Sequence, residues 1–141
     1  MPHPEEISPT VLTRSEDSGG RVSLVENRAS GDFAGPPLHK HDFDEAFYIL
    51  EGELTFQVED DVFTVGAGEV VFAPGGVPHA LANHSGAPMR YLLVCTPAGF
   101  ERHFDRVAAE QAGVEPPPSA SGPIPEVTVV GPQIERRETA S

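Results

Sequence analysis

Short runs of β-branched and aromatic residues follow one another along most of the chain, and this rhythm limits the fold more than any other feature. In order they are RVSLVENR (21–28), EAFYILE (45–51), ELTFQVE (53–59), VFTV (62–65), EVVFA (69–73), HALAN (79–83) and MRYLLVCT (89–96). Turn-forming segments such as GAG and PGGVP separate them. Short, closely spaced strands of this kind favour a β-sandwich or barrel over alternating strands and helices. Glu51 and Gly52 fit a tight hairpin between two of these strands.

The hydrophobic period changes after the last of these runs. Phe100, Phe104 and Val107 follow a three-four spacing, which predicts an amphipathic helix over about residues 98–112. Gly113 is placed to end this helix.

The two ends of the chain differ from its middle in composition. Residues 1–20 and 114–141 are rich in Pro, Ser and Gly, so we expect a flexible N-terminal segment, a folded body over 21–113 and a largely disordered tail. VTVV (127–130) is suited to adding a strand to an exposed sheet edge, although a flexible tail is the favoured interpretation.

Composition excludes several classes of partner. The chain has 141 residues, of which 38% are hydrophobic, and this suits one domain with one modest core. Its net charge of -13 would repel nucleic acid and anionic membranes. No secretory or membrane-spanning pattern is present, so we expect a cytoplasmic protein. Cys95 is the only cysteine, which rules out an intramolecular disulfide, and its apolar neighbours predict a buried thiol.

Three histidines and a glutamate have the spacing of a shared site. His39 and His41 would lie on one face of a strand, about 7 Å apart, whereas Glu45 would lie about 13 Å farther along a straight strand. The chain must therefore bend, and the aspartates of DFD (42–44) favour such a turn. In GEVVFAPGGVPHALAN (68–83), a strand, a tight turn and a second strand would aim His79 inward.

These segments resemble the two motifs of the cupin superfamily. HKHDFDEAFYILEG (39–52) is similar to the first motif, although Phe33 stands near the point where a glycine usually precedes the histidines. The second motif is met at every marked position, namely at Gly68, Pro74, Gly76, His79 and Asn83. The resemblance implies an all-β, single-domain jelly-roll barrel with a C-terminal helix. It also implies one metal ion held by His39, His41, Glu45 and His79.

The ligand set agrees with that implication. Three neutral imidazoles and a carboxylate suit one divalent transition metal, namely Fe, Mn, Ni, Co, Cu or Zn, and an octahedral ion held by four protein ligands keeps two open positions. His3, His84 and His103 have no comparable spacing.

A substrate pocket beside the ligands would be mostly apolar. Strand parity and the predicted helix give seven tentative lining residues: Phe47, Ile49, Leu81, Tyr91, Leu93, Phe100 and Phe104. Such a lining suits an aromatic substrate, but inward apolar residues also fill small barrels without binding anything. The two helical phenylalanines would cover the mouth of the barrel, or they would simply pack on the sheet.

The resemblance is greatest to small bacterial cupins grouped with quercetin 2,3-dioxygenase. It implies a dioxygenase that combines O2 with an electron-rich enolic or phenolic aromatic, with Glu45 as the catalytic base. Two alternatives stay open: a metal-dependent isomerase, cyclase or lyase that acts through an enolate, and a small-molecule-binding protein without activity. Cupins commonly dimerise, so we also expect a homodimer.

Overall fold

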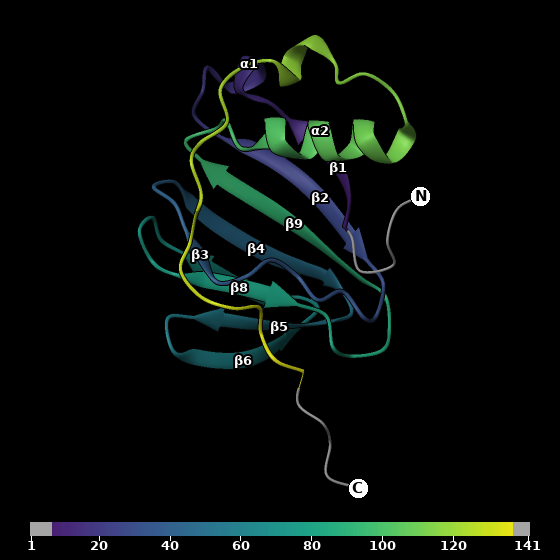
Figure 1. The fold of residues 1–141 in the computed structure, drawn as a ribbon, viewed down its shortest axis with the longest axis vertical. Coiled ribbons are helices and arrows are strands. Elements are labelled where there is room, and N and C mark those ends of the chain that lie inside the picture. Colours follow the sequence, from purple (N-terminus) through teal and green to yellow (C-terminus); the bar gives the residue numbers. More distant parts are fainter. Residues whose placement is uncertain (1–6, 137–141) are drawn as a thin grey trace, which may run out of the picture.

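Two antiparallel sheets of five strands each face one another as the walls of a barrel in the computed structural model, which describes residues 7–136 (Figure 1). The first sheet contains, in spatial order, β1 (Ser8–Thr13), β2 (Ser23–Ala29), β9 (Met89–Thr96), β4 (Asp44–Glu51) and β7 (Val70–Ala73). The second contains β10 (Thr128–Val129), β3 (His39–Lys40), β8 (His79–Ala82), β5 (Glu53–Val58) and β6 (Asp61–Gly66). The predicted all-β barrel is confirmed.

The core lies between the sheets because side chains alternate along each strand. On β9, the side chains at 89, 91, 93 and 95 are buried and those between them are partly exposed. Register then aligns the inward side chains of β4, β9 and β2 in three successive rows. These are the Glu45 row (Glu45, Cys95, Ser23), the Phe47 row (Phe47, Leu93, Val25) and the Ile49 row (Ile49, Tyr91, Asn27).

The predicted hairpin at Glu51 and Gly52 is wrong. β4 pairs with β7 and β9, whereas β5 pairs with β6 and β8, so the two residues carry the chain from one sheet to the other. Gly52 has a φ of 83°, and a Cβ there would lie 2.6 Å from the carbonyl oxygen of Pro88. The chain therefore needs glycine at residue 52 in order to cross between the sheets. It does not form a hairpin there.

The helices lie at one end of the barrel, at the top of Figure 1. The predicted helix is present as α2 (Glu101–Ala112), ends at Gly113 in the left-handed conformation and buries Phe104 and Ala109. A short helix, α1 (Ser15–Ser18), lies near its start, where the Glu101 carboxylate accepts hydrogen bonds from the backbone N–H groups of Ser15 (2.7 Å) and Gly99 (2.6 Å). None of the helices in the described range has the length and hydropathy to cross a membrane.

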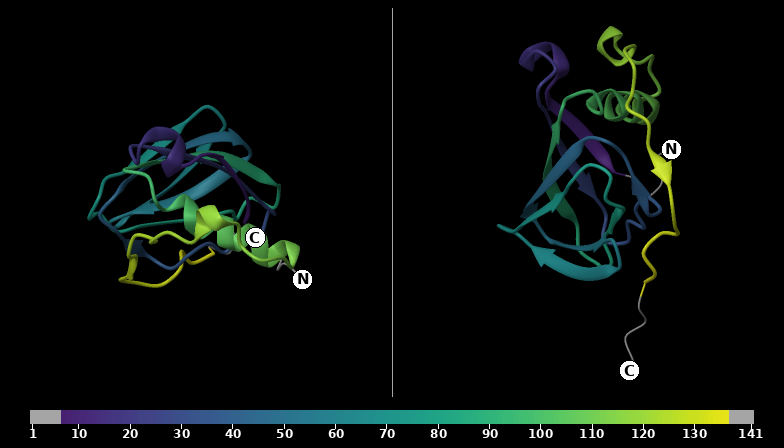
Figure 2. Two further views of the ribbon diagram at one scale, coloured as in Figure 1. Left: turned by 90° about the horizontal axis from the view of Figure 1, so that it is seen from above. Right: turned by 90° about the vertical axis from the view of Figure 1, so that its left-hand side faces the viewer.

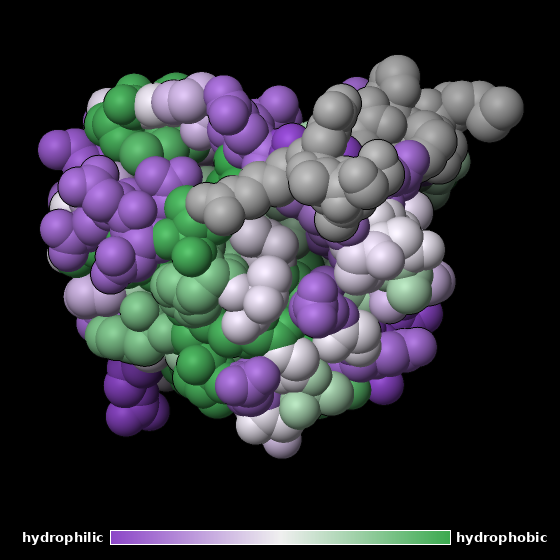
Figure 3. All heavy atoms as spheres, turned by 90° about the horizontal axis from the view of Figure 1, so that it is seen from below, coloured by the Kyte–Doolittle hydropathy of each residue, from purple (hydrophilic) through white to green (hydrophobic). Residues whose placement is uncertain are grey.

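The opposite end of the barrel carries the β5–β6 hairpin. Seen from this end, hydrophobic surface lies between hydrophilic groups (Figure 3). Val62 and Phe63 of β6 are among the exposed apolar residues of the molecule.

The C-terminal segment runs along the open side of the barrel, past β3 and β8 (Figures 1 and 2). We call residues 121–136 the strap; it follows the short helix η1 (Pro118–Ala120). β10 of the strap pairs with β3, and Leu38 exchanges backbone hydrogen bonds with Val130 (2.8 Å) and Pro132 (3.0 Å). Ile134 is buried against Leu38, Ala80 and Ala82.

Both predicted flexible ends therefore need correction within the described range. Over residues 114–136 the tail contains η1 and β10, and over 7–20 the chain contains α1 and β1, which pairs with β2 along its length. Composition predicts how much apolar area a segment offers, but it does not reveal an existing strand edge on which the segment pairs. VTVV adds a strand to such an edge, which was the less favoured interpretation.

Candidate metal centre

Three histidines and a glutamate from both sheets converge inside the barrel. His39 on β3 and His79 on β8 are directly paired in the second sheet, Glu45 lies on β4 of the first, and His41 lies in the bend between β3 and β4. One potential ligand atom from each residue lies within 4.8 Å of the others. The predicted bend thus brings together residues that a straight strand would separate.

Each imidazole is held by a backbone carbonyl two residues away. The pairs, measured from Nδ1 to the carbonyl oxygen, are His39 with Pro37 (2.8 Å), His41 with Phe43 (2.9 Å) and His79 with Val77 (3.0 Å). Because a carbonyl oxygen only accepts, Nδ1 carries the hydrogen in each ring. Nε2 is therefore the metal-binding atom, and the rings are oriented before any ion binds.

Glu45 is the shared partner of two of these rings. Its Oε1 lies 2.8 Å from Nε2 of both His41 and His79. Burial by itself would raise the pKa of Glu45, but the two histidines lower that pKa to about 2. Burial lowers the pKa of His79, but Glu45 outweighs it and the pKa is raised, whereas burial lowers the pKa of His39. Glu45 is thus held as a carboxylate.

The four residues fit a transition-metal ion. Neighbouring ligands around an ion with bonds of about 2.1 Å lie about 3 Å apart, close to the 2.8 Å between Oε1 and each of the two Nε2 atoms. Three imidazole nitrogens and one carboxylate oxygen form a donor set that accepts several divalent ions of the first transition row. The chain therefore has a candidate site for one metal ion.

The turn of the second motif fixes the bend that carries His41. The N–H of Gly76 donates to the His41 carbonyl (2.7 Å), and the N–H of Gly75 donates to Oδ1 of Asp44 (2.7 Å). A Cβ on Gly75 would lie 2.2 Å from the carbonyl oxygen of Asp42. Because residue 75 has no side chain, the turn of the second motif can pack directly against the bend of the first motif.

A mostly apolar cavity of about 860 Å³ opens beside the four residues and includes His39 and Glu45 in its wall. Six of the seven predicted pocket residues line it: Phe47, Leu81, Tyr91, Leu93, Phe100 and Phe104. The exception is Ile49, which is fully buried in the core. Strand parity predicts the face on which a side chain lies, but not whether it borders empty space.

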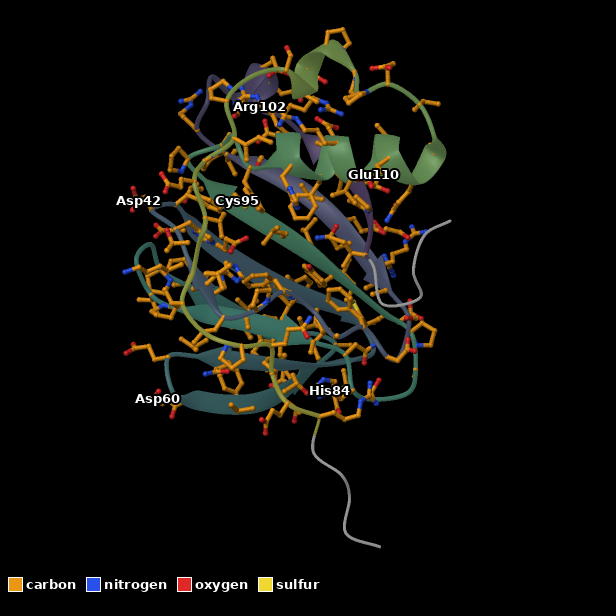
Figure 4. All side chains as sticks on the ribbon, viewed as in Figure 1. Asp42, Asp60, His84, Cys95, Arg102 and Glu110 are labelled. Carbon is orange, nitrogen blue, oxygen red and sulfur yellow. The ribbon has the colours of Figure 1, made fainter. Side chains whose placement is uncertain are left out.

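Much of the cavity wall comes from segments outside the motifs. The strap contributes Ile124, Pro125, Val127, Val129 and Gln133; α2 adds His103, Val107, Glu110 and Gln111; and Ile7 and residues 33–37 complete the wall. Of the histidines without motif spacing, His103 therefore borders the cavity, whereas His84 lies in the loop after β8 (Figure 4). The apolar VTVV segment was the one sequence signal that pointed to the strap.

A comparison with protein families agrees with this arrangement. A family profile described as a cupin domain matches residues 28–95, the stretch that carries all four candidate ligands. Residues 28–95 therefore match a cupin domain. The two facing sheets are the walls of the cupin double-stranded β-helix, and α2 and the strap are additions to that domain.

Similar structures are known among solved proteins. The TT1209 protein from Thermus thermophilus is 27% identical, with a TM-score of 0.59 over 67% of this chain and 87% of that one. The polyketide cyclase RemF from Streptomyces resistomycificus is 30% identical, with a TM-score of 0.58 over 64% of this chain and 65% of that one.

A curated relative is similar over a shorter stretch. The uncharacterized protein MJ1618 from Methanocaldococcus jannaschii is 33% identical over 61 residues, which are 43% of this chain and 49% of the relative. The chain thus matches about half the length of that protein.

Proposed function

We propose that this cupin is a metal-dependent enzyme that removes a proton from the hydroxyl group of an enolic or phenolic aromatic substrate. The observation that carries the proposal is that His39 and Glu45, two of the four converging candidate ligands, line a mostly apolar cavity of about 860 Å³, a volume within the usual range for small-molecule sites. A divalent ion held by His39, His41, Glu45 and His79 would polarise a substrate oxygen and acidify its hydroxyl group.

Glu45 is the proposed base. The two neighbouring histidines hold the pKa of Glu45 below its ordinary value, and the positive charge of a bound ion would likewise favour the carboxylate, so Glu45 is a weak base. A weak base accepts a proton only from a strongly acidified hydroxyl, so Glu45 and the ion would have to act on the same oxygen. Phe47, Leu93 and Phe104 in the cavity wall would pack against the aromatic ring and exclude water.

Reaction with O2 is the first candidate for the step that follows. The resemblance of the two motifs to quercetinase-like cupins supports it. In such a reaction the deprotonated aromatic supplies the electrons, both oxygen atoms enter the product and the ring opens, so no external reductant is needed.

An oxygen-independent cyclisation is the second candidate. The 30% identity to RemF, a polyketide cyclase, supports it. Here the same proton removal would give an enolate that attacks a carbonyl carbon of its own chain. Both candidates begin with the same residues, and dependence on O2 separates them.

The experiment compares turnover per bound metal with and without oxygen, using a flavonol and a poly-ketone aromatic precursor as substrates. Glu45→Gln should reduce turnover per metal by about 100-fold or more, whereas Glu110→Gln, which alters another carboxylate of the cavity wall, should change it little. Full turnover by Glu45→Gln would exclude this base. Equal conversion without O2 would exclude the dioxygenase and favour the cyclase, and tight binding with no conversion would favour a binding protein.

A further inference from the structure

A buried polar pair lies in the mostly apolar interior of the barrel, away from the metal centre. Asn27 on β2 and Tyr91 on β9 are directly opposite in the first sheet, and Nδ2 of Asn27 donates to the Tyr91 hydroxyl (3.0 Å). Both residues are buried, and Tyr91 also lines the cavity. Burial raises the pKa of Tyr91, so its hydroxyl keeps its hydrogen.

The pair leaves hydrogen-bonding groups unused. Within residues 7–136, Oδ1 of Asn27 has no hydrogen-bond partner, and the Tyr91 hydroxyl accepts a hydrogen bond but has no acceptor for its own hydrogen. Turning the amide around would let Tyr91 donate to Oδ1 and would leave the Asn27 NH2 group free instead. In the first arrangement the free donor is the hydroxyl of Tyr91, the residue of the pair that lines the cavity. Unpaired buried polar groups reduce stability, so a purely structural role does not explain this pair.

The pair and the metal centre lie toward opposite ends of the cavity. Tyr91 and Asn27 belong to the Ile49 row, which is four residues along β4 from Glu45, or about 13 Å. The ring of Phe47 lies between them, with its centre 5.7 Å from that of Tyr91 and 6.2 Å from that of His79. A ligand that reaches both ends would therefore be elongated and would contact an aromatic wall.

The charge of the cavity wall limits which ligand groups can bind beside Tyr91. No lysine or arginine is among the described residues that line the cavity, whereas Glu45 and Glu110 are. An anionic group would find no cation beside Tyr91. A neutral hydroxyl or carbonyl oxygen would accept the free hydrogen of the pair.

We propose that Tyr91 and Asn27 form a specificity subsite that binds a neutral oxygen at the end of an elongated aromatic substrate. This inference rests on the proposed function, because the opposite end of the substrate is the one that reaches the metal centre. The substrate class is a flat molecule of two or three rings that carries oxygens at both ends.

The test uses two ligands that differ only at the end that would lie beside Tyr91. They are 3-hydroxyflavone and its 4′-hydroxy derivative. Binding to the metal-loaded protein is measured by fluorescence titration without O2. Wild type should prefer the hydroxylated ligand by about tenfold. Tyr91→Phe should abolish that preference, so that the two ligands bind with similar affinity. The matched control is Tyr48→Phe, because Tyr48 is the only other tyrosine and lies exposed on the outer face of β4.

A double variant separates recognition from folding. Tyr91→Phe leaves Asn27 without a partner, so Asn27→Leu is combined with it to replace both polar groups by apolar ones. The double variant should melt at or above the wild-type temperature while it loses the preference, because removing both partners of a buried pair is close to neutral. A large loss of stability with the preference retained would show that the pair is structural and would overturn the inference.

The same titrations distinguish failure of the subsite from failure of the proposed function. If Tyr91→Phe leaves the preference intact while His79→Ala abolishes binding, the subsite is wrong and the metal-dependent site stands. If the preference depends on Tyr91 but binding survives loss of the metal, the subsite stands and the proposed function is wrong. If neither ligand binds, both are overturned.

Discussion

His79 tests the metal centre at the level of one residue. It contributes one of four converging ligand atoms and pairs directly with His39 across the second sheet. His79→Ala should weaken metal binding by more than the roughly 10- to 100-fold that loss of an outer partner of a ligand costs. Equilibrium dialysis followed by metal analysis measures this. His84→Ala is the control, since His84 lies in a loop outside the site. Equal occupancy of both variants would contradict the assignment.

Cys95 provides a second test at this scale. The predicted burial of its thiol is confirmed, and Sγ lies 3.8 Å from Oε2 of Glu45. Burial and the neighbouring carboxylate raise the pKa of Cys95 well above its ordinary value. We expect the native protein to react with a thiol reagent about 100-fold or more slowly than the unfolded protein, because the thiolate is the reactive form. Rapid modification of the folded protein, followed by absorbance, would contradict this environment.

Single residues also show where sequence reasoning succeeds and fails. The four candidate ligands were predictable because the spacing of each motif is local and a turn closes each gap. Asn27 gave no signal, since an asparagine within a strand becomes notable only when Tyr91 is placed opposite it. Ile49 has the parity of a pocket residue but lies deeper in the core than the cavity reaches.

At the scale of elements, Glu101 fixes the start of α2. Its buried carboxylate accepts hydrogen bonds from the Ser15 hydroxyl and from the N–H groups of Ser15 and Gly99. Glu101→Gln should lower the free energy of unfolding at neutral pH by about 2 kcal/mol, because these bonds involve a charged acceptor. Urea denaturation measures the difference, and Glu115→Gln, at an exposed residue beyond the helix, should be neutral.

The effect of Glu101 should depend on pH with a definite sign. Burial opposes ionisation, but the hydrogen bonds outweigh it and hold the pKa of Glu101 below the ordinary value of 4.5. The carboxylate therefore contributes its full stabilisation above that value and loses it as the pH falls through the lower folded-state pKa. Wild type and Glu101→Gln should converge in stability under acid. A constant difference from pH 7 to pH 3 would show that ionisation is not involved.

The strap is an element that the amino-acid composition of the tail does not predict. Ile134 is buried against Leu38 and Ala82, while Val130 of the same strap is 44% exposed. Ile134→Ala should reduce the free energy of unfolding by about 2 kcal/mol, whereas Val130→Ala should change it by less than about 0.5 kcal/mol. Thermal scans of both variants test this, and equal melting temperatures would show that the strap adds little to stability.

Strands with strong alternation and the periodic helix α2 were predictable because each carries its pattern within a few residues. β10 was not, since two residues become a strand only through pairing with Lys40 and His39, which lie far away in the sequence. The role of Glu51 and Gly52 was missed for the same reason, because the choice between a hairpin and a change of sheet depends on the partners of β4 and β5.

At the scale of the whole molecule, the outer face of the first sheet carries several exposed apolar side chains. Its outward side chains form two adjacent rows. One row consists of Leu24, Val94, Ala46 and Phe72, and the other of Leu92, Tyr48 and Val70. Val70 and Phe72 are more than half exposed, and charged groups of both signs, Glu26 and Arg90, lie beside them. Such a face suits a second copy of the chain, because a two-fold contact places the same rows and charges against each other.

The expected homodimer can therefore be tested on this face. Light scattering after size exclusion should give twice the monomer mass, and Val70→Lys should shift it toward the monomer. Val62→Lys is the matched control, because Val62 is an exposed valine on β6 of the other sheet. Since each copy carries a charge of -13, added salt should strengthen the association by screening repulsion. A monomer at every salt concentration would reject the dimer.

The strap lies outside residues 28–95 but forms part of the cavity wall. The candidate metal ligands and part of the cavity wall are thus encoded in separate stretches of the chain. Exchange of residues 121–136 for another sequence would alter the shape of the cavity while every candidate ligand stays in place. If the proposed function is right, replacing the end of such a chain changes its substrates and leaves the chemistry of its middle unchanged.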